Sequence, residues 1–180
     1  FNNQIWVTTA KSDGKELYAV CIDFQTGKII YDIKVFTPDE IERKITIHAK
    51  PFHCQWQDHR IYFLDTPGVA DFYGETMAAV HAADAAIIVV DGVAGGEIGT
   101  RRVWKLLEET QKPRLIFVNK LDKENSDFFR CVEQIQQVFG KNCIPVEMPQ
   151  GSQAGFTKVL NLRTTPEAEV PAEQRAQFHK

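Results

Sequence analysis

Two short polar turns in this sequence could carry chemistry, and the first is Asp65-Thr66-Pro67-Gly68. It directly follows the apolar run Ile61–Leu64, which predicts a strand. Because α/β sheets place ligands at the carboxyl ends of their strands, Asp65 could hold Mg²⁺ through water beside a terminal phosphate. Gly68 has no side chain, so its backbone N–H could approach a phosphate oxygen closely. A strand ending in an Asp-capped turn with no ligand fits the same four residues.

The second polar turn is Asn119-Lys120-Leu121-Asp122, after the apolar run Leu115–Val118. A carboxylate at Asp122 can accept two hydrogen bonds from guanine, at the ring N–H and the exocyclic amine, and adenine has no matching pair of donors. We expect Asn119 to brace the loop and the Lys120 stem to lie along the base plane. A polar strand-to-helix turn without a ligand is the alternative.

The segments around these turns predict an α/β sheet. Ala85–Val90 and Leu115–Val118 are continuous apolar runs, as expected of parallel strands buried on both faces. Between them, residues 103–110 carry apolar side chains at helical spacing. Strand–helix–strand alternation with right-handed crossovers would bring both polar turns to one sheet edge, within reach of one nucleotide.

A second helix and a further strand follow the Asn119–Asp122 turn. Apolar residues recur at helical spacing over Phe128–Phe139, with Ser126 or Asp127 as the cap and Gly140 as the stop. Cys143–Val146 then predicts a strand.

The first 36 residues contain short runs of β-branched and aromatic residues, which predict a small antiparallel β-meander. Its strands would be Gln4–Thr9, Leu17–Phe24 and Ile29–Phe36, separated by Gly-containing turns. A hairpin of residues 44–56 and 59–64, turning at Gln57-Asp58, would come next. We therefore predict three regions: the meander (1–36), an α/β domain (37–162), and a linker with a partial helix (163–180).

Composition excludes several classes of function. The apolar fraction of 43% and charged fraction of 25% are ordinary for a globular chain, and the net charge is −3. Without a Lys/Arg run we expect no direct DNA binding, and without a long apolar stretch no membrane span. The four cysteines form no C-x-x-C pair, which favours reduced thiols over a disulfide frame or zinc site.

Several motifs together resemble elongation factor G, a translational GTPase, over residues 39–162. They are Glu42-Arg43-Lys44-Ile45-Thr46-Ile47, Asp65-Thr66-Pro67-Gly68, Ala70-Asp71-Phe72, Ala82-Ala83-Asp84-Ala85-Ala86, Val90-Asp91-Gly92-Val93, Glu97-Ile98-Gly99-Thr100, Val118-Asn119-Lys120-Leu121-Asp122 and Gly155-Phe156. The resemblance implies a P-loop-GTPase-like, mostly parallel sheet with helices on both faces. It also implies GTP or GDP with Mg²⁺, a ribosomal partner, a cytoplasmic location, and hydrolysis coupled to translocation or ribosome release.

The resemblance also assigns roles to individual residues. Thr46, in the first switch, would coordinate Mg²⁺ through its hydroxyl. Asp65 and Gly68 would belong to the second switch, with Asp65 beside the metal. The guanine contacts would come from Asn119, Lys120 and Asp122.

The sequence departs from this family in ways that predict weak or absent turnover. No G-x-x-x-x-G-K-[ST] phosphate-binding loop occurs in the 180 residues, nor do the first strand and first helix that flank it. Val69 stands where the family usually has a water-orienting histidine, so we name no catalytic residue. With that strand missing, we expect either a meander strand to fill the gap or residues 59–64 to pair with residues 85–90.

The amino-terminal segment has its own resemblance. Residues 13–20 and 26–31 resemble one blade of a quinone-enzyme-type (PQQ-like) β-propeller, and a single blade cannot close a propeller. The chain starts at Phe1 without methionine and stops in a polar helical pattern, so we expect a fragment. Three functions stay open: an elongation-factor GTPase, a non-hydrolysing guanine-nucleotide-binding remnant, and an inert chimera.

Overall fold

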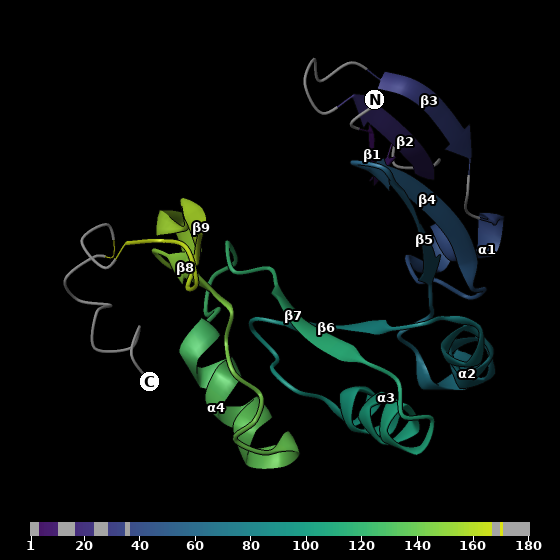
Figure 1. The fold of residues 1–180 in the computed structure, drawn as a ribbon. Coiled ribbons are helices and arrows are strands. Elements are labelled where there is room, and N and C mark those ends of the chain that lie inside the picture. Colours follow the sequence, from purple (N-terminus) through teal and green to yellow (C-terminus); the bar gives the residue numbers. More distant parts are fainter. Residues whose placement is uncertain (1–3, 11–16, 24–28, 35–36, 167–169, 171–180) are drawn as a thin grey trace. The chain divides into compact units, whose positions relative to one another are not determined.

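The computed structural model describes residues 4–10, 17–23, 29–34, 37–166 and 170, in two compact units of residues 1–85 and 86–180 (Figure 1). The first unit contains β1 (Gln4–Ala10), β2 (Leu17–Asp23), β3 (Ile29–Lys34), α1 (Pro38–Arg43), β4 (Lys50–Trp56), β5 (His59–Asp65), η1 (Ala70–Phe72) and α2 (Tyr73–Ala82). The second contains β6 (Ala86–Asp91), α3 (Ile98–Glu109), β7 (Arg114–Asn119), α4 (Phe128–Phe139), β8 (Glu147–Gln150), η2 (Gln153–Gly155) and β9 (Lys158–Asn161).

The strands of the first unit form one antiparallel sheet in the order β3-β2-β1-β4-β5. The predicted meander and the predicted hairpin are both confirmed, and Gln57 takes a positive φ of 51° in the hairpin turn. The meander joins the hairpin at β4, through Gln4 opposite Gln55. The meander pairs with β4 and not with β5, so among the described strands no meander strand lies beside β5. Pairing of residues 59–64 with residues 85–90 would join the two units and stays a prediction.

A short helix occupies residues that the sequence assigned only to a join. Pro38 takes the first turn of α1, and the Thr37 hydroxyl accepts from the N–H of Glu40 while the Glu40 carboxylate accepts from the N–H of Thr37. Lys44 then ends the helix in a left-handed conformation. As a result the following strand begins at Lys50 rather than at Lys44.

The parallel pairing that defines the α/β part is found in β6 and β7, with α3 packed beside β6 (Figure 1). Ile88 and Val90 are buried on one face. The other face is open: Ile87 is 57% and Phe117 55% exposed. The expectation of burial on both faces is therefore wrong for these strands. Within the described part of this unit, helices cover only the face that carries Ile88 and Val90.

The carboxyl-terminal half of the second unit contains the predicted helix and a displaced strand. α4 runs over Phe128–Phe139 as expected, with Asp127 as its cap and Gly140 as its stop. The predicted strand Cys143–Val146 is wrong, since the strand lies four residues later at β8, where β9 pairs with it antiparallel. Met148 of β8 and Leu160 of β9 form a buried hydrophobic core together with Val170.

The helices within the described ranges are all too short or too polar to cross a membrane.

Candidate functional site

Two neighbouring strands place the second polar turn at a sheet edge. β6 and β7 run parallel in register, so Asp91 at the end of β6 lies opposite Asn119 at the end of β7. The backbone N–H of Gly92 donates to the carbonyl of Asn119 at 2.8 Å, which extends the contact beyond the strands. The Asn119–Asp122 turn therefore begins where a parallel sheet presents its carboxyl ends.

The turn is held by its own side chains and by a second loop. Lys120 has a φ of 61°, and its N–H donates to Oδ1 of Asn119 at 2.9 Å. The carbonyl of Leu121 accepts from the Ser126 hydroxyl at 2.8 Å and from the N–H of Gln153 at 3.0 Å. Asp122 is exposed on this supported turn. Within the described part of the chain, no hydrogen bond or ion pair engages its carboxylate, so both oxygens are available to a ligand.

Asp91 contributes a second carboxylate at the same edge. Its Oδ2 lies 2.7 Å from the Lys120 Nζ, and its Oδ1 accepts from the N–H groups of Val93 (2.8 Å) and Ala94 (3.1 Å). The Lys120 hydrogen bond and then these two N–H groups lower the pKa of Asp91 to about 2. Asp91 in turn raises the pKa of Lys120. Both groups therefore carry their charges at neutral pH.

Gly92 is the residue that lets the two strand ends approach this closely. A Cβ added there would lie 2.8 Å from the Asn119 carbonyl oxygen and 3.0 Å from Cδ2 of Leu121. The Gly92 carbonyl also accepts from the N–H of Asp127 at 3.0 Å, which ties the start of α4 to this edge. The position therefore requires glycine for close approach rather than for an unusual φ.

The first unit contains a buried polar network beside the predicted switch residue Thr46. The Glu40 side chain is fully buried, and its carboxylate accepts from the N–H groups of Ile47 (2.8 Å) and His48 (3.3 Å). Lys50 Nζ lies 2.6 Å from Oε2 of the same carboxylate. Burial alone would raise the pKa of Glu40, but the Lys50 contact and the backbone donors together lower it to about 2.

The remaining predicted site residues lie in this first unit. Asp65 ends β5 opposite Lys50; burial raises its pKa, as does the Glu40 charge, while Lys50 opposes the shift. Thr46 is half-buried in the segment before β4. A Cβ at Gly68 would meet nothing within 4 Å, so local packing does not require that glycine. Asn119, Lys120 and Asp122 come together in one turn of the second unit. That this turn and the Asp65–Gly68 turn lie at one sheet edge stays a prediction.

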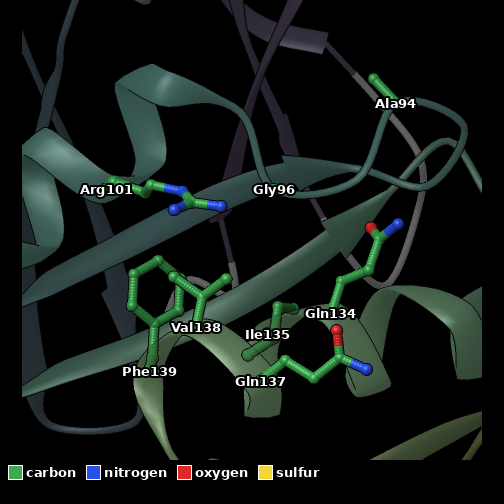
Figure 2. A pocket seen from close by; sticks show the side chains of 8 residues that line it. All are labelled: Ala94, Gly96, Arg101, Gln134, Ile135, Gln137, Val138 and Phe139. Carbon is green, nitrogen blue, oxygen red and sulfur yellow. The ribbon is translucent and has the colours of Figure 1, made fainter.

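A pocket of about 210 Å³ lies elsewhere in the second unit and contains none of the predicted residues (Figure 2). Its lining residues come from the loop after β6, from α3 and from α4: Ala94, Gly96, Arg101, Gln134, Ile135, Gln137, Val138 and Phe139. Figure 2 shows apolar and amide side chains of α4 along one side and the Arg101 guanidinium across from them. The mixture gives no defined chemistry, so we assign it no role.

Several residues at these sites were not singled out for a role from the sequence. Asp91 and Gly92 follow an apolar strand just as Asp65 and Asn119 do, so the rule that identified the two turns would have identified them too. Glu40 could have been found from the Thr37-Pro38-Asp39-Glu40 capping pattern. Gln153 has no local signal, because its contact with Leu121 depends on the β8–β9 hairpin.

Comparison with known proteins gives the family of the chain. The model of the elongation factor Tu GTP binding domain family matches residues 14–175, a range that begins inside the predicted meander. The mitochondrial ribosome-releasing factor 2 of Culex quinquefasciatus is 40% identical over 127 residues, covering 71% of this chain. Elongation factor G of Thermotoga maritima is 41% identical over 125 residues, covering 69%.

These relatives are much longer than the chain, which covers 17% and 18% of them respectively. A crystal structure of a protein from Thermus thermophilus superposes with a TM-score of 0.70 at 30% identity, covering 79% of this chain and 23% of that one. The family match spans most of the 180 residues, and the fold agrees with it. The chain belongs to the elongation factor Tu GTP-binding domain family, the GTP-binding domains of translation factors.

Proposed function

We propose that this chain binds guanine nucleotides through the Asn119–Asp122 turn and hydrolyses GTP weakly or not at all. The observation that carries the proposal is the exposed Asp122 carboxylate, which no described residue engages, on a turn braced by Asn119 and Leu121. Such a carboxylate can accept from both guanine donors at once. The Lys120 stem would cover the base plane, as the family resemblance implies.

The first unit contains the residues that the family resemblance assigns to Mg²⁺ and to phosphate. Thr46 and Asp65 would hold Mg²⁺, which when bound would neutralise phosphate charge, and the Gly68 N–H would meet a phosphate oxygen. Mg²⁺ prefers oxygen ligands and keeps several waters and substrate phosphates, so one hydroxyl and one carboxylate suit it.

Weak or absent hydrolysis follows from what the 180 residues lack. A phosphate-binding loop supplies the N–H groups and lysine that neutralise the β- and γ-phosphates, and none occurs here. Val69 cannot orient an attacking water. The amino-terminal meander, which we interpret as one propeller-type blade, offers no quinone site on its own.

The physiological setting is inferred from the longer relatives. Their names, elongation factor G and ribosome-releasing factor 2, place them in translation. We infer from this likeness a cytoplasmic location and the ribosome rather than DNA or a membrane as partner. GTP hydrolysis coupled to a ribosomal step is the activity that the family resemblance implies.

The test is a titration of the chain with fluorescent GDP, GTP and XDP in the presence of Mg²⁺. We expect saturable binding of GDP. Asp122→Asn should weaken it about 10- to 100-fold, because a charged acceptor of two hydrogen bonds is lost, and should strengthen XDP binding. Glu124→Gln, an exposed acidic neighbour in the same loop, is the matched control and should change neither affinity.

Three outcomes separate the alternatives. Binding with the Asp122→Asn switch and little or no phosphate release from GTP supports the proposal. Sustained phosphate release over many turnovers would restore the elongation-factor GTPase. No binding of any guanine nucleotide would leave an inert chimera and contradict the proposal.

A further inference from the structure

The ion pair between Asp91 and Lys120 joins two strand ends at the predicted guanine site. The Lys120 Nζ lies 2.7 Å from Oδ2 of Asp91. The carboxylate cannot swing freely, because its Oδ1 accepts from two backbone N–H groups of its own turn, those of Val93 and Ala94. Asp91 is therefore a fixed anchor, and the long lysine side chain is the part that it orders.

The backbone fixes the distance between the two partners. Asp91 and Asn119 are register neighbours, and the Gly92 N–H reaches the Asn119 carbonyl at 2.8 Å. The left-handed conformation of Lys120, at a φ of 61°, places its side chain at the start of the turn. The pair is thus built into the sheet edge and does not depend on a chance meeting of two surface side chains.

Stability alone does not explain this ion pair. The Lys120 side chain is 55% exposed and that of Asp91 30% exposed, and ion pairs at exposed positions contribute little to folding. What the contact does supply is order, since a lysine that must settle on a ligand loses rotamer freedom when it binds. A lysine that is already held by Asp91 loses less.

We propose that Asp91 is a positioning residue for guanine recognition, which holds the Lys120 stem where the base plane will lie. This inference rests on the proposed function, because it concerns the same nucleotide site. Asp91 itself does not touch the nucleotide; it acts through Lys120. A pre-ordered lysine of this kind should strengthen binding about three- to tenfold.

The test asks whether removing the Asp91 charge raises or lowers the affinity for GDP. Asp91→Asn keeps an acceptor for Val93 and Ala94 but loses the charge that holds Lys120. If Asp91 acted only through its charge, its removal would strengthen the binding of an anionic nucleotide. The positioning role predicts the opposite, a GDP affinity about three- to tenfold weaker. GMP should show the same loss, because Lys120 acts at the base.

Two further variants complete the experiment. Glu97→Gln removes an acidic charge that acts on Lys120 without a hydrogen bond, and should leave GDP affinity unchanged or slightly stronger. In a Lys120→Met background, Asp91→Asn should have no further effect. Thermal melts of each variant check that it is folded.

The outcomes distinguish this inference from the proposed function. If the unmodified chain binds no guanine nucleotide, the proposed function and the positioning role fall together. If the chain binds GDP but the Asp91→Asn variant binds GDP equally well or more tightly, the positioning role alone is wrong. It is also wrong if Asp91→Asn lowers GDP affinity by the same factor with Lys120 present and in the Lys120→Met background.

Discussion

The two units use their carboxylates in opposite ways. In the first unit, Glu40 is fully buried and its oxygens are taken up by backbone N–H groups and by Lys50. In the second, Asp122 is exposed and unengaged within the described residues, and Asp91 holds an exposed lysine beside it. A buried and saturated carboxylate organises the fold, whereas an exposed one on a braced turn can meet a ligand. The first unit should therefore respond to substitution mainly in stability, the second mainly in binding.

The largest expected effect comes from removing the buried carboxylate. Glu40→Ala should lower the free energy of unfolding by about 3–5 kcal/mol, because the N–H groups of Ile47 and His48 would lose a buried acceptor and the Lys50 ion pair would be broken. Urea unfolding of the chain measures this. Glu42→Ala, two residues away in the same helix and exposed, should cost less than about 0.5 kcal/mol. A similar loss in both variants would show that the Glu40 network contributes no more to the free energy of unfolding than an exposed carboxylate does.

Acid should remove the same contribution gradually. The pKa of Glu40 is lowered from 4.5 to about 2, so its stabilising effect is fully present above pH 4.5 and is lost as the pH falls toward 2. The shift corresponds to about 3 kcal/mol. Urea unfolding between pH 6 and pH 2 should show this loss in the unmodified chain and a shallower slope in Glu40→Gln. Equal slopes would mean that other carboxyl groups dominate the acid response.

Gly92 lies at the second unit's edge and should affect both stability and binding. Gly92→Ala would press a methyl group against the Asn119 carbonyl and should cost about 1–3 kcal/mol. GDP affinity should fall with it, because Asn119 begins the recognition turn. Gly96→Ala, where an added Cβ would meet nothing within 4 Å, is the control and should be nearly neutral. Thermal unfolding and GDP titration of both variants check the pair; an unaffected Gly92→Ala would contradict the close approach.

Local signals predicted the second unit best where they were strongest. α4 begins and ends as expected because Asp127 supplies a side-chain cap and Gly140 stops the helix. The Asn119–Asp122 turn could be recognised because it follows an apolar run, and β6 and β7 are confirmed as parallel neighbours. These features depend on short stretches of sequence.

What could not be predicted depends on contacts between distant segments. β8 was placed four residues too early because pairing with β9 decides which residues form the strand. Continuous apolar runs suggested burial on both faces of β6 and β7, but the face with Ile87 and Phe117 is open. The Glu40 network was missed because Lys50 lies ten residues along the chain and reaches the carboxylate only after α1 has formed.

The central claim is that the edge formed by the ends of β6 and β7 recognises guanine, and backbone NMR with nucleotide titration tests it most directly. We predict that GDP shifts the amide signals of Gly92, Asn119, Lys120 and Asp122 in a saturable way, while ADP at the same concentrations does not. Equal shifts with ADP, or GDP shifts confined to other parts of the chain, would contradict the claim.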